Sequence, residues 1–241
     1  MNQIYNDLGQ PIGPPLDSWT VPERPARTTL EGRFCRLEPL DPESHAAELY
    51  EEYSADTRGT IWTYLPYGPF ESGTEFETWM RRDCLDDDPL FYAIVELAGG
   101  RTAGVASYLR INPSAGSIEV GHINYAPVLQ RTAAATEAMY LLMKYAFELG
   151  YRRYEWKCDS LNGPSRSAAM RLGFSYEGLF RQATIYKGRS RDTAWYSIID
   201  SEWPQLKAAY ERWLEPDNFG PDGRQKVSLS ALTAPVIKQR G

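Results

Sequence analysis

The sequence predicts a mixed α/β fold of the α+β class, with three layers in which helices flank a central, mostly antiparallel sheet of about seven strands. Short alternating apolar stretches joined by turn residues occupy the middle of the chain, which favours antiparallel strands. Two strand-then-helix units follow, which favour crossovers around one sheet. Apolar residues make up 42% and charged residues 24% of the 241 residues, as in ordinary globular proteins.

The chain divides into three predicted parts. Residues 1–30 are polar and rich in proline, so we expect an extended arm without a core of its own. Residues 31–214 contain the predicted strands and helices and form one domain. Residues 215–241 are again polar, and we expect a loop-like tail.

The first half of the domain is marked by local signals at helix starts. Asp41 and Pro42 are typical of an N-cap and a first helical residue. The turn residues 98–101 predict a hairpin. The predicted elements are a strand over 33–40, a helix over 41–53, a helix from Ser72 or Thr74 to 85, and strands over 91–97, 102–111 and 117–125.

The second half shows helical periodicity and a second hairpin. One apolar stripe runs along residues 132–149, and Gly150 is typical of a helix end. The remaining predicted elements are a strand over 152–158, a helix capped by Asn162 and ended by Gly173, hairpin strands over 176–186 and 192–199, and a helix capped by Ser201 that ends near 214.

Composition excludes several classes of function. The net charge is −6, which argues against a general nucleic-acid binder. There is no run of 18 apolar residues, so we expect no membrane span. With only two histidines we expect no metal site, and three widely spaced cysteines fit a reducing cytoplasm.

Small residues surround the start of the helix at 132. The first N–H groups of a helix lack internal partners and lie at the positive end of its dipole. Because Ala133, Ala134 and Ala135 have little bulk, a phosphate can approach this backbone, and Arg131 adds charge. An alanine-rich helix packed closely on a sheet explains the same residues equally well.

A second helix start with small and polar residues lies at Asn162 and Ser165. It also follows a strand, so two helix N-termini are expected side by side at neighbouring strand ends, where ligands bind in α/β sheets. Helix capping is the alternative role for both side chains.

Four motifs in order resemble the GNAT N-acetyltransferases, in the branch of the ribosomal-protein alanine/serine N-acetyltransferases. Residues 131–136 are similar to the family's Q/R-x-x-G-x-G/A signature, although its glycine is replaced by Ala134. Asn162, Ser165 and Gly173-Phe174 match its second element, and residues 177–181 and 187–192 match its closing hairpin. The resemblance covers about residues 31–203, and Glu119-Val120-Gly121 also fits.

The resemblance implies acetyl-CoA as co-substrate. The pyrophosphate would lie on the N–H groups of 131–136, the pantetheine beside the end of the strand near Tyr125, and the thiol near Asn162 and Ser165. The residues expected to bind acetyl-CoA are therefore Tyr125, Gln130, Arg131, Thr132, Ala133, Ala134, Ala135, Thr136, Asn162 and Ser165.

The catalytic groups are less clearly marked. The family's acidic tyrosine is replaced by Ala169, so Ser165 or a water is expected to protonate the leaving thiolate. Attack by an amine is helped by a base. The candidates are Glu119 and His122, which have opposite parity on one strand so that only one can face the cleft, and Asp159 at a strand end.

The aromatic loop at 60–70 supplies the expected acceptor site, through Trp62, Tyr64 and Tyr67. Its alternative role is to cover the core. We therefore predict a cytoplasmic N-acetyltransferase acting on a primary amine, either a protein N-terminus or a small amine. A non-catalytic acyl-CoA sensor or interaction module is the alternative, and the arms, which lack a visible core, favour a homodimer.

Overall fold

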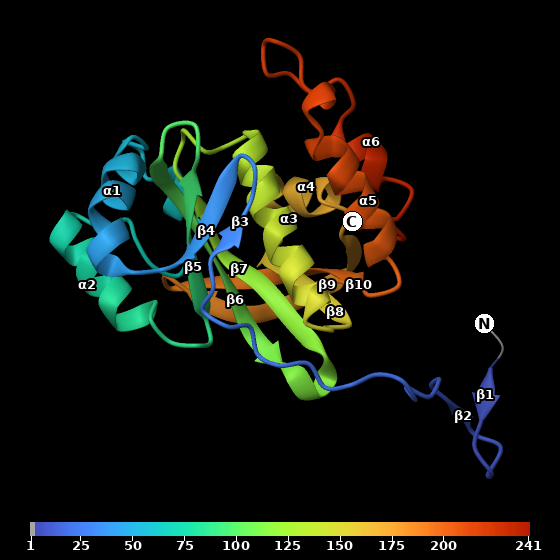
Figure 1. Cartoon of the computed structure of the whole chain (residues 1–241). Helices are drawn as coiled ribbons and strands as arrows, with labels where there is room; N and C mark the ends of the chain where they lie inside the picture. The colour runs from blue at the N-terminus through green and yellow to red at the C-terminus, as the bar shows by residue number, and fades with distance from the viewer. Residues whose placement is uncertain (1–2) are drawn as a thin grey trace.

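The computed structural model describes residues 3–241 and is built around an eight-stranded sheet (Figure 1). Its order is β3-β4-β5-β6-β7-β8-β10-β9, and only β7 and β8 are parallel. The seven predicted strands are confirmed, and the short β3 adds an eighth. The strands are β3 (Leu30–Glu31), β4 (Cys35–Pro39), β5 (Leu90–Glu96), β6 (Arg101–Asn112), β7 (Ser117–Tyr125), β8 (Arg153–Asp159), β9 (Ser175–Tyr186) and β10 (Arg189–Ile199).

Helices cover both faces of this sheet, which gives the predicted three layers (Figure 1). One face is covered by α1 and α2, and the other by α3, α4 and α5. The helices are α1 (Pro42–Ser54), α2 (Gly73–Asp83), α3 (Ala133–Glu148), α4 (Gly163–Arg171), α5 (Trp203–Leu214) and α6 (Leu229–Thr233), with short 3-10 turns η1 (Thr60–Trp62), η2 (Pro113–Ala115) and η3 (Pro216–Asn218). Within the described residues, no helix is both long and apolar enough to cross a bilayer.

Three of the four predicted helix caps are confirmed. The side chains of Asp41, Ser72 and Asn162 each accept a hydrogen bond from a backbone N–H in the first turn of their helix, and Thr132, for which no cap was predicted, does the same for α3. The prediction for Ser201 was wrong, because α5 follows Glu202 and has no side-chain cap.

The later part of the arm and the tail pack on the domain. The earlier part of the arm forms an exposed hairpin of β1 (Ile4–Tyr5) and β2 (Pro11–Ile12), which projects from the body (Figure 1). Farther along, the backbone of Ala26 bonds the hydroxyls of Tyr145 and Tyr92. The expectation of a loop-like tail was wrong, since it contains α6 and buries Leu229 and Val236 in the main core.

The single parallel pair opens the sheet. The last residues that β7 and β8 pair are Val120 and Trp156. Beyond them β7 continues along β6 as far as Tyr125, while β8 continues along β10 to Asp159. The two strands therefore diverge, and each presents an edge to the space between them.

Candidate active site

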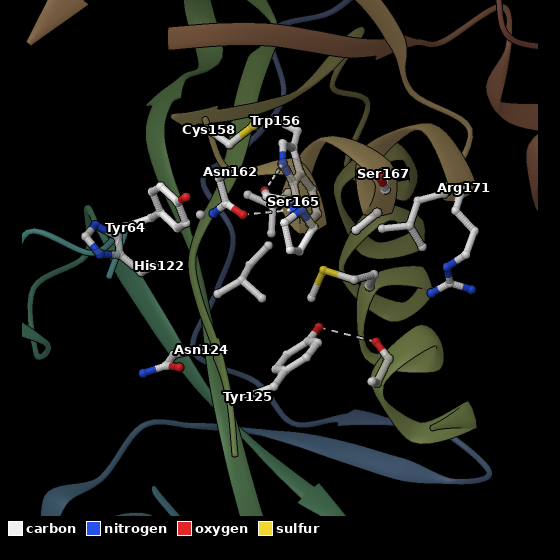
Figure 2. Close-up of a pocket in the computed structure, with 18 of the residues that line it drawn as sticks. Tyr64, His122, Asn124, Tyr125, Trp156, Cys158, Asn162, Ser165, Ser167 and Arg171 are labelled. Carbon is white, nitrogen blue, oxygen red and sulfur yellow. Dashed lines mark hydrogen bonds between the residues drawn. The ribbon is translucent and has the colours of Figure 1, made fainter. Parts of the chain in front are cut away.

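A cleft of about 1690 Å³ lies where β7 and β8 diverge (Figure 2). It is lined by the two strands, the start of α3, one face of α4, the β9–β10 hairpin and the loop at η1. A drug-sized ligand needs roughly 300–1,000 Å³. The cleft can therefore hold a long cofactor and a second molecule together.

The start of α3 forms one wall. Thr132 Oγ1 accepts from the N–H of Ala135 at 3.1 Å, while the preceding residues of the turn hold Arg131 with a φ of 63°. The predicted residues Gln130, Arg131, Thr132, Ala133, Ala135 and Thr136 line the cleft. Ala134 is different, because it is buried in the main core and is not among the residues that line the cleft. Close packing of this helix on the sheet is confirmed, and the same turn also lines the cleft.

Tyr125 and Gln130 brace this wall. The Tyr125 hydroxyl donates to the carbonyl of Ala135 at 3.3 Å, and Gln130 Nε2 donates to the carbonyl of Tyr125 at 3.0 Å. Both residues line the cleft. They connect the free end of β7 to the first turn of α3.

The start of α4 forms the opposite wall (Figure 2). Asn162 Oδ1 caps the helix through the N–H of Ser165 at 3.1 Å, and Ser165 Oγ accepts from Trp156 Nε1 at 3.0 Å. Capping is thus confirmed, and both side chains also line the cleft.

Sequence reasoning missed the rest of this face of α4. Pro164, Ser167, Ala168 and Arg171 line the cleft at helical spacing, a signal that could have been found once Asn162 marked the helix start. Arg171 Nη2 donates to Thr136 Oγ1 at 3.0 Å and so joins α4 to α3. Arg171 therefore adds a second guanidinium, with that of Arg131, to the residues that line the cleft.

Glu119 lies in the cleft on β7 and is only 3% exposed. Its carboxylate contacts Arg110 Nη1 at 2.7 Å and Lys157 Nζ at 2.8 Å. Burial raises the pKa of Glu119 above its ordinary value, and the two cations oppose this rise. Lys157 is itself held by Glu155 at 2.8 Å and by the ring of Trp195, so the buried charges are paired.

A β-bulge changes the predicted parity of His122. Two residues of β7, His122 and Ile123, lie opposite Ala106 of β6, and His122 adopts a φ of 50°. The prediction that only one of Glu119 and His122 faces the cleft was therefore wrong, because both line it. A second bulge in β6 gives Arg110 a φ of 49° beside Glu119.

His122 is held as a neutral ring. Its Nδ1 lies 3.0 Å from the hydroxyl of Tyr67, and its ring packs on Phe91 at 5.1 Å. Burial, with a smaller contribution from the charge of Arg110, lowers the pKa of His122 from 6.5 to about 4. A ring that stays neutral down to pH 4 is a weak base but a well-placed hydrogen-bonding partner.

The depressed pKa predicts a pH-dependent stability that His122→Gln removes. Unfolding returns the ring to a pKa near 6.5, so the unfolded chain binds the extra proton as pH falls from 6.5 towards 4. The native state thus loses up to about 3 kcal/mol over this window from this residue. Urea unfolding at pH 7 and pH 4.5 should show a smaller difference for His122→Gln than for the wild type. Equal differences in the two proteins would contradict the assignment.

The carboxylate of Asp159, the third candidate base, accepts hydrogen bonds from two neighbouring groups. One oxygen accepts from the Tyr186 hydroxyl at 2.8 Å, and the other accepts from the N–H of Leu161 at 2.9 Å. These bonds hold the turn between β8 and α4. Asp159 also lines the cleft, but its hydrogen bonds stabilise that turn.

The aromatic loop contributes less than expected. Trp62 is buried in the second core against Tyr53 and Phe70, so it does not line the cleft and the expectation that it binds substrate was wrong. Tyr67 lies behind His122 and reaches the cleft only through that ring. Tyr64 does line the cleft, and its hydroxyl donates to the carbonyl of Leu161 at 3.1 Å, closing one side.

A sheet whose single parallel pair opens over a helix N-terminus is the architecture of an acyl-CoA N-acyltransferase. A family model described as an acetyltransferase (GNAT) domain matches residues 35–175. The chain belongs to the GNAT family of N-acetyltransferases, and the resemblance found in its motifs is confirmed. A comparison with curated proteins finds no match.

Solved structures support the same family. A GCN5-related N-acetyltransferase from Brucella melitensis is 47% identical, with a TM-score of 0.88 over 91% of this chain and 100% of that chain. A probable acetyltransferase of the GNAT family from Chromobacterium violaceum is 41% identical, with a TM-score of 0.75 over 80% and 97%. The ribosomal alpha-N-protein acetyltransferase RimL, 22% identical with a TM-score of 0.60 over 71% and 94%, shares the fold.

Proposed function

We propose that this enzyme transfers the acetyl group of acetyl-CoA to a primary amine, with both molecules bound in the cleft at once. The observation that carries the proposal is the buried Glu119, which lies in the same cleft as the start of α3. A base and an anion-binding helix start in one cleft favour turnover over the alternative of a non-catalytic acyl-CoA sensor.

The residues present fit acetyl-CoA. Backbone N–H groups of the first turn of α3, with Arg131 and Arg171, would hold its pyrophosphate. The edge of β7 beyond Val120 offers backbone groups to a pantetheine chain. When bound, acetyl-CoA supplies an acetyl group activated as a thioester.

Glu119 would remove the proton from the acceptor amine, directly or through one water. Its raised pKa makes it a better base than an ordinary carboxylate, and Arg110 and Lys157 hold it in place. His122, with its pKa near 4, would orient the amine through hydrogen bonds rather than accept the proton.

Ser165 would supply the proton that the departing sulfur takes up. Its oxygen accepts from Trp156, which leaves its own hydroxyl proton free to be donated. Ala169 has no polar atom on its side chain and is fully buried, so no acid stands at the position of the family's tyrosine.

The acceptor would enter over Tyr64, between the η1 loop and the β9–β10 hairpin. A protein N-terminus and a small amine both fit the chemistry of this entrance. We place the enzyme in the cytoplasm, because its three cysteines are buried free thiols that suit a reducing compartment. A homodimer is also proposed, because the edge strand β9 exposes Leu179 and Ile185.

Calorimetric titration with acetyl-CoA, followed by thiol release over a panel of amines, tests the proposal. We expect micromolar binding and amine-dependent release, with peptides beginning in alanine or serine compared with amino acids and polyamines. Binding without release for any amine would favour the sensor.

Ala168→Trp places a large side chain on the cofactor wall. We expect it to weaken acetyl-CoA at least tenfold, because the ring would occupy the space between α3 and α4. Ala98→Trp, in the exposed β5–β6 turn, is the matched control and should bind like the wild type. Equal affinity of the two variants would remove the cleft as the binding site.

A further inference from the structure

The tail forms a small hairpin between α5 and α6. Phe219 and Gln225 pair antiparallel, and the N–H of Gly220 donates to the carbonyl of Arg224 at 2.9 Å. We call residues 218–226 the C-terminal hairpin. It projects beyond α5 and α6 in Figure 1.

The C-terminal hairpin is firmly attached at its base. Asn218 is 2% exposed, and its side chain donates to the carbonyl of Trp213 at 2.9 Å and accepts from the N–H of Val227 at 2.8 Å. Trp213 Nε1 donates to Gln225 Oε1 at 2.7 Å. Phe219 packs its ring on Trp213 at 5.1 Å and on Phe34 at 5.6 Å. These contacts fix where the tip lies.

The same hairpin lines the cleft at the α3 end. Trp213, Phe219, Gly223, Arg224 and Gln225 are among the lining residues, together with the start of α3. The backbone N–H of Phe34, on which the hairpin packs, is held by Glu137 of α3 at 2.6 Å. The hairpin therefore lies close to the first turns of α3, where the pyrophosphate is proposed to bind.

Three guanidinium groups, those of Arg131, Arg171 and Arg224, are among the residues that line the cleft. Arg224 is 89% exposed, and its nearest carboxylate is that of Asp222 on the same turn, 3.5 Å away. Such an exposed, long ion pair is weak, so the guanidinium can turn to a stronger anion. Trp213 and Phe219 provide apolar surface beside it.

We propose that the C-terminal hairpin closes the nucleotide end of the cofactor site and that Arg224 binds the 3′-phosphate of coenzyme A. This inference rests on the proposed binding of acetyl-CoA at the start of α3. Coenzyme A carries a pyrophosphate and a separate phosphate on its ribose. The start of α3 with Arg131 suits the pyrophosphate, and the ribose phosphate, farther from the thiol, needs a cation of its own. A guanidinium fork matches a phosphate well.

The test compares acetyl-CoA with 3′-dephospho-acetyl-CoA by calorimetry. Arg224→Ala should weaken acetyl-CoA roughly three- to tenfold and leave the affinity for the dephospho ligand unchanged. Arg240→Ala is the matched control, because Arg240 is exposed in the same tail and lies outside the cleft lining. It should change neither affinity.

The changes that Arg224→Ala causes in the affinities for the two ligands decide whether Arg224 binds the 3′-phosphate. Equal weakening of both ligands by Arg224→Ala, or no change in either, would overturn the assignment of the 3′-phosphate. A wild-type protein that binds neither ligand would overturn the proposed function, and the hairpin assignment with it. Unchanged thermal stability of Arg224→Ala confirms that the variant is folded in each case.

Discussion

Glu119→Gln should lower kcat by about 100-fold or more and leave the KM for acetyl-CoA within about twofold. The amide keeps the shape of the side chain but cannot take a proton from the amine, and positioned bases contribute about 10²–10⁴ in rate. The wild-type rate should fall as pH drops through the raised pKa of Glu119, because only the ionised form acts as base. Glu119→Gln should lack this dependence. Steady-state rates from pH 5 to 9 measure both effects.

Glu155→Gln is the matched control for this variant. Glu155 also contacts Lys157 at 2.8 Å but does not line the cleft. Its replacement perturbs the same buried charges without touching the proposed base, so kcat should stay within about threefold. Equal losses in the two variants would show that Glu119 only balances charge. A Glu119→Gln enzyme with normal kcat would exclude it as base.

Glu137→Ala should lower the melting temperature by roughly 10 °C or more. The buried Glu137 carboxylate accepts backbone N–H groups of Arg33, Phe34 and Cys35 at 2.8, 2.6 and 2.9 Å. Each orphaned buried donor costs about 1–3 kcal/mol. Partial hydration would leave a loss of about 3–5 kcal/mol, at about 2–4 °C per kcal/mol for a chain of this size.

Glu148→Ala on the same helix is the control for that loss. Glu148 is half-exposed and contacts only Lys144, at 3.8 Å. Its replacement should change stability by less than about 0.5 kcal/mol. Calorimetric melting of both variants at pH 7 distinguishes the two roles, and a small shift for Glu137→Ala would mean that the strand start does not depend on this clamp.

Local chemistry explains which elements could be predicted. Asp41 and Asn162 cap helices through contacts within three residues, so the sequence pattern carries the signal. The bulges at Arg110 and His122 have no such signal, because a positive φ at a residue other than glycine is imposed by the neighbouring strand. That is why the parity of Glu119 and His122 was predicted wrongly.

Some residues of the candidate site could likewise be predicted from the sequence, and others could not. The residues from Gln130 to Thr136 follow one another in the chain, so their common wall was visible in the sequence. Trp62 was assigned to the cleft because aromatic loops serve cores and ligand sites alike, and only packing distinguishes them. Arg224 belongs to the C-terminal tail, whose position depends on the Asn218 contacts. No local sequence pattern therefore predicts that Arg224 lines the cleft.

The bulge in β7 changes which residues of that strand, odd-numbered or even-numbered, face each side of the sheet. Before it, the even-numbered Ile118 and Val120 pack on the side of α3, and after it the odd-numbered Ile123 and Tyr125 do so. Deleting Ile123 would restore a uniform alternation in which Asn124 and Tyr125 keep their present partners on β6, Val105 and Gly104. His122 alone would turn over, to the side of α3 and away from Tyr67 and Phe91. The extra residue of the bulge is therefore what holds His122 on the same side of the sheet as Glu119.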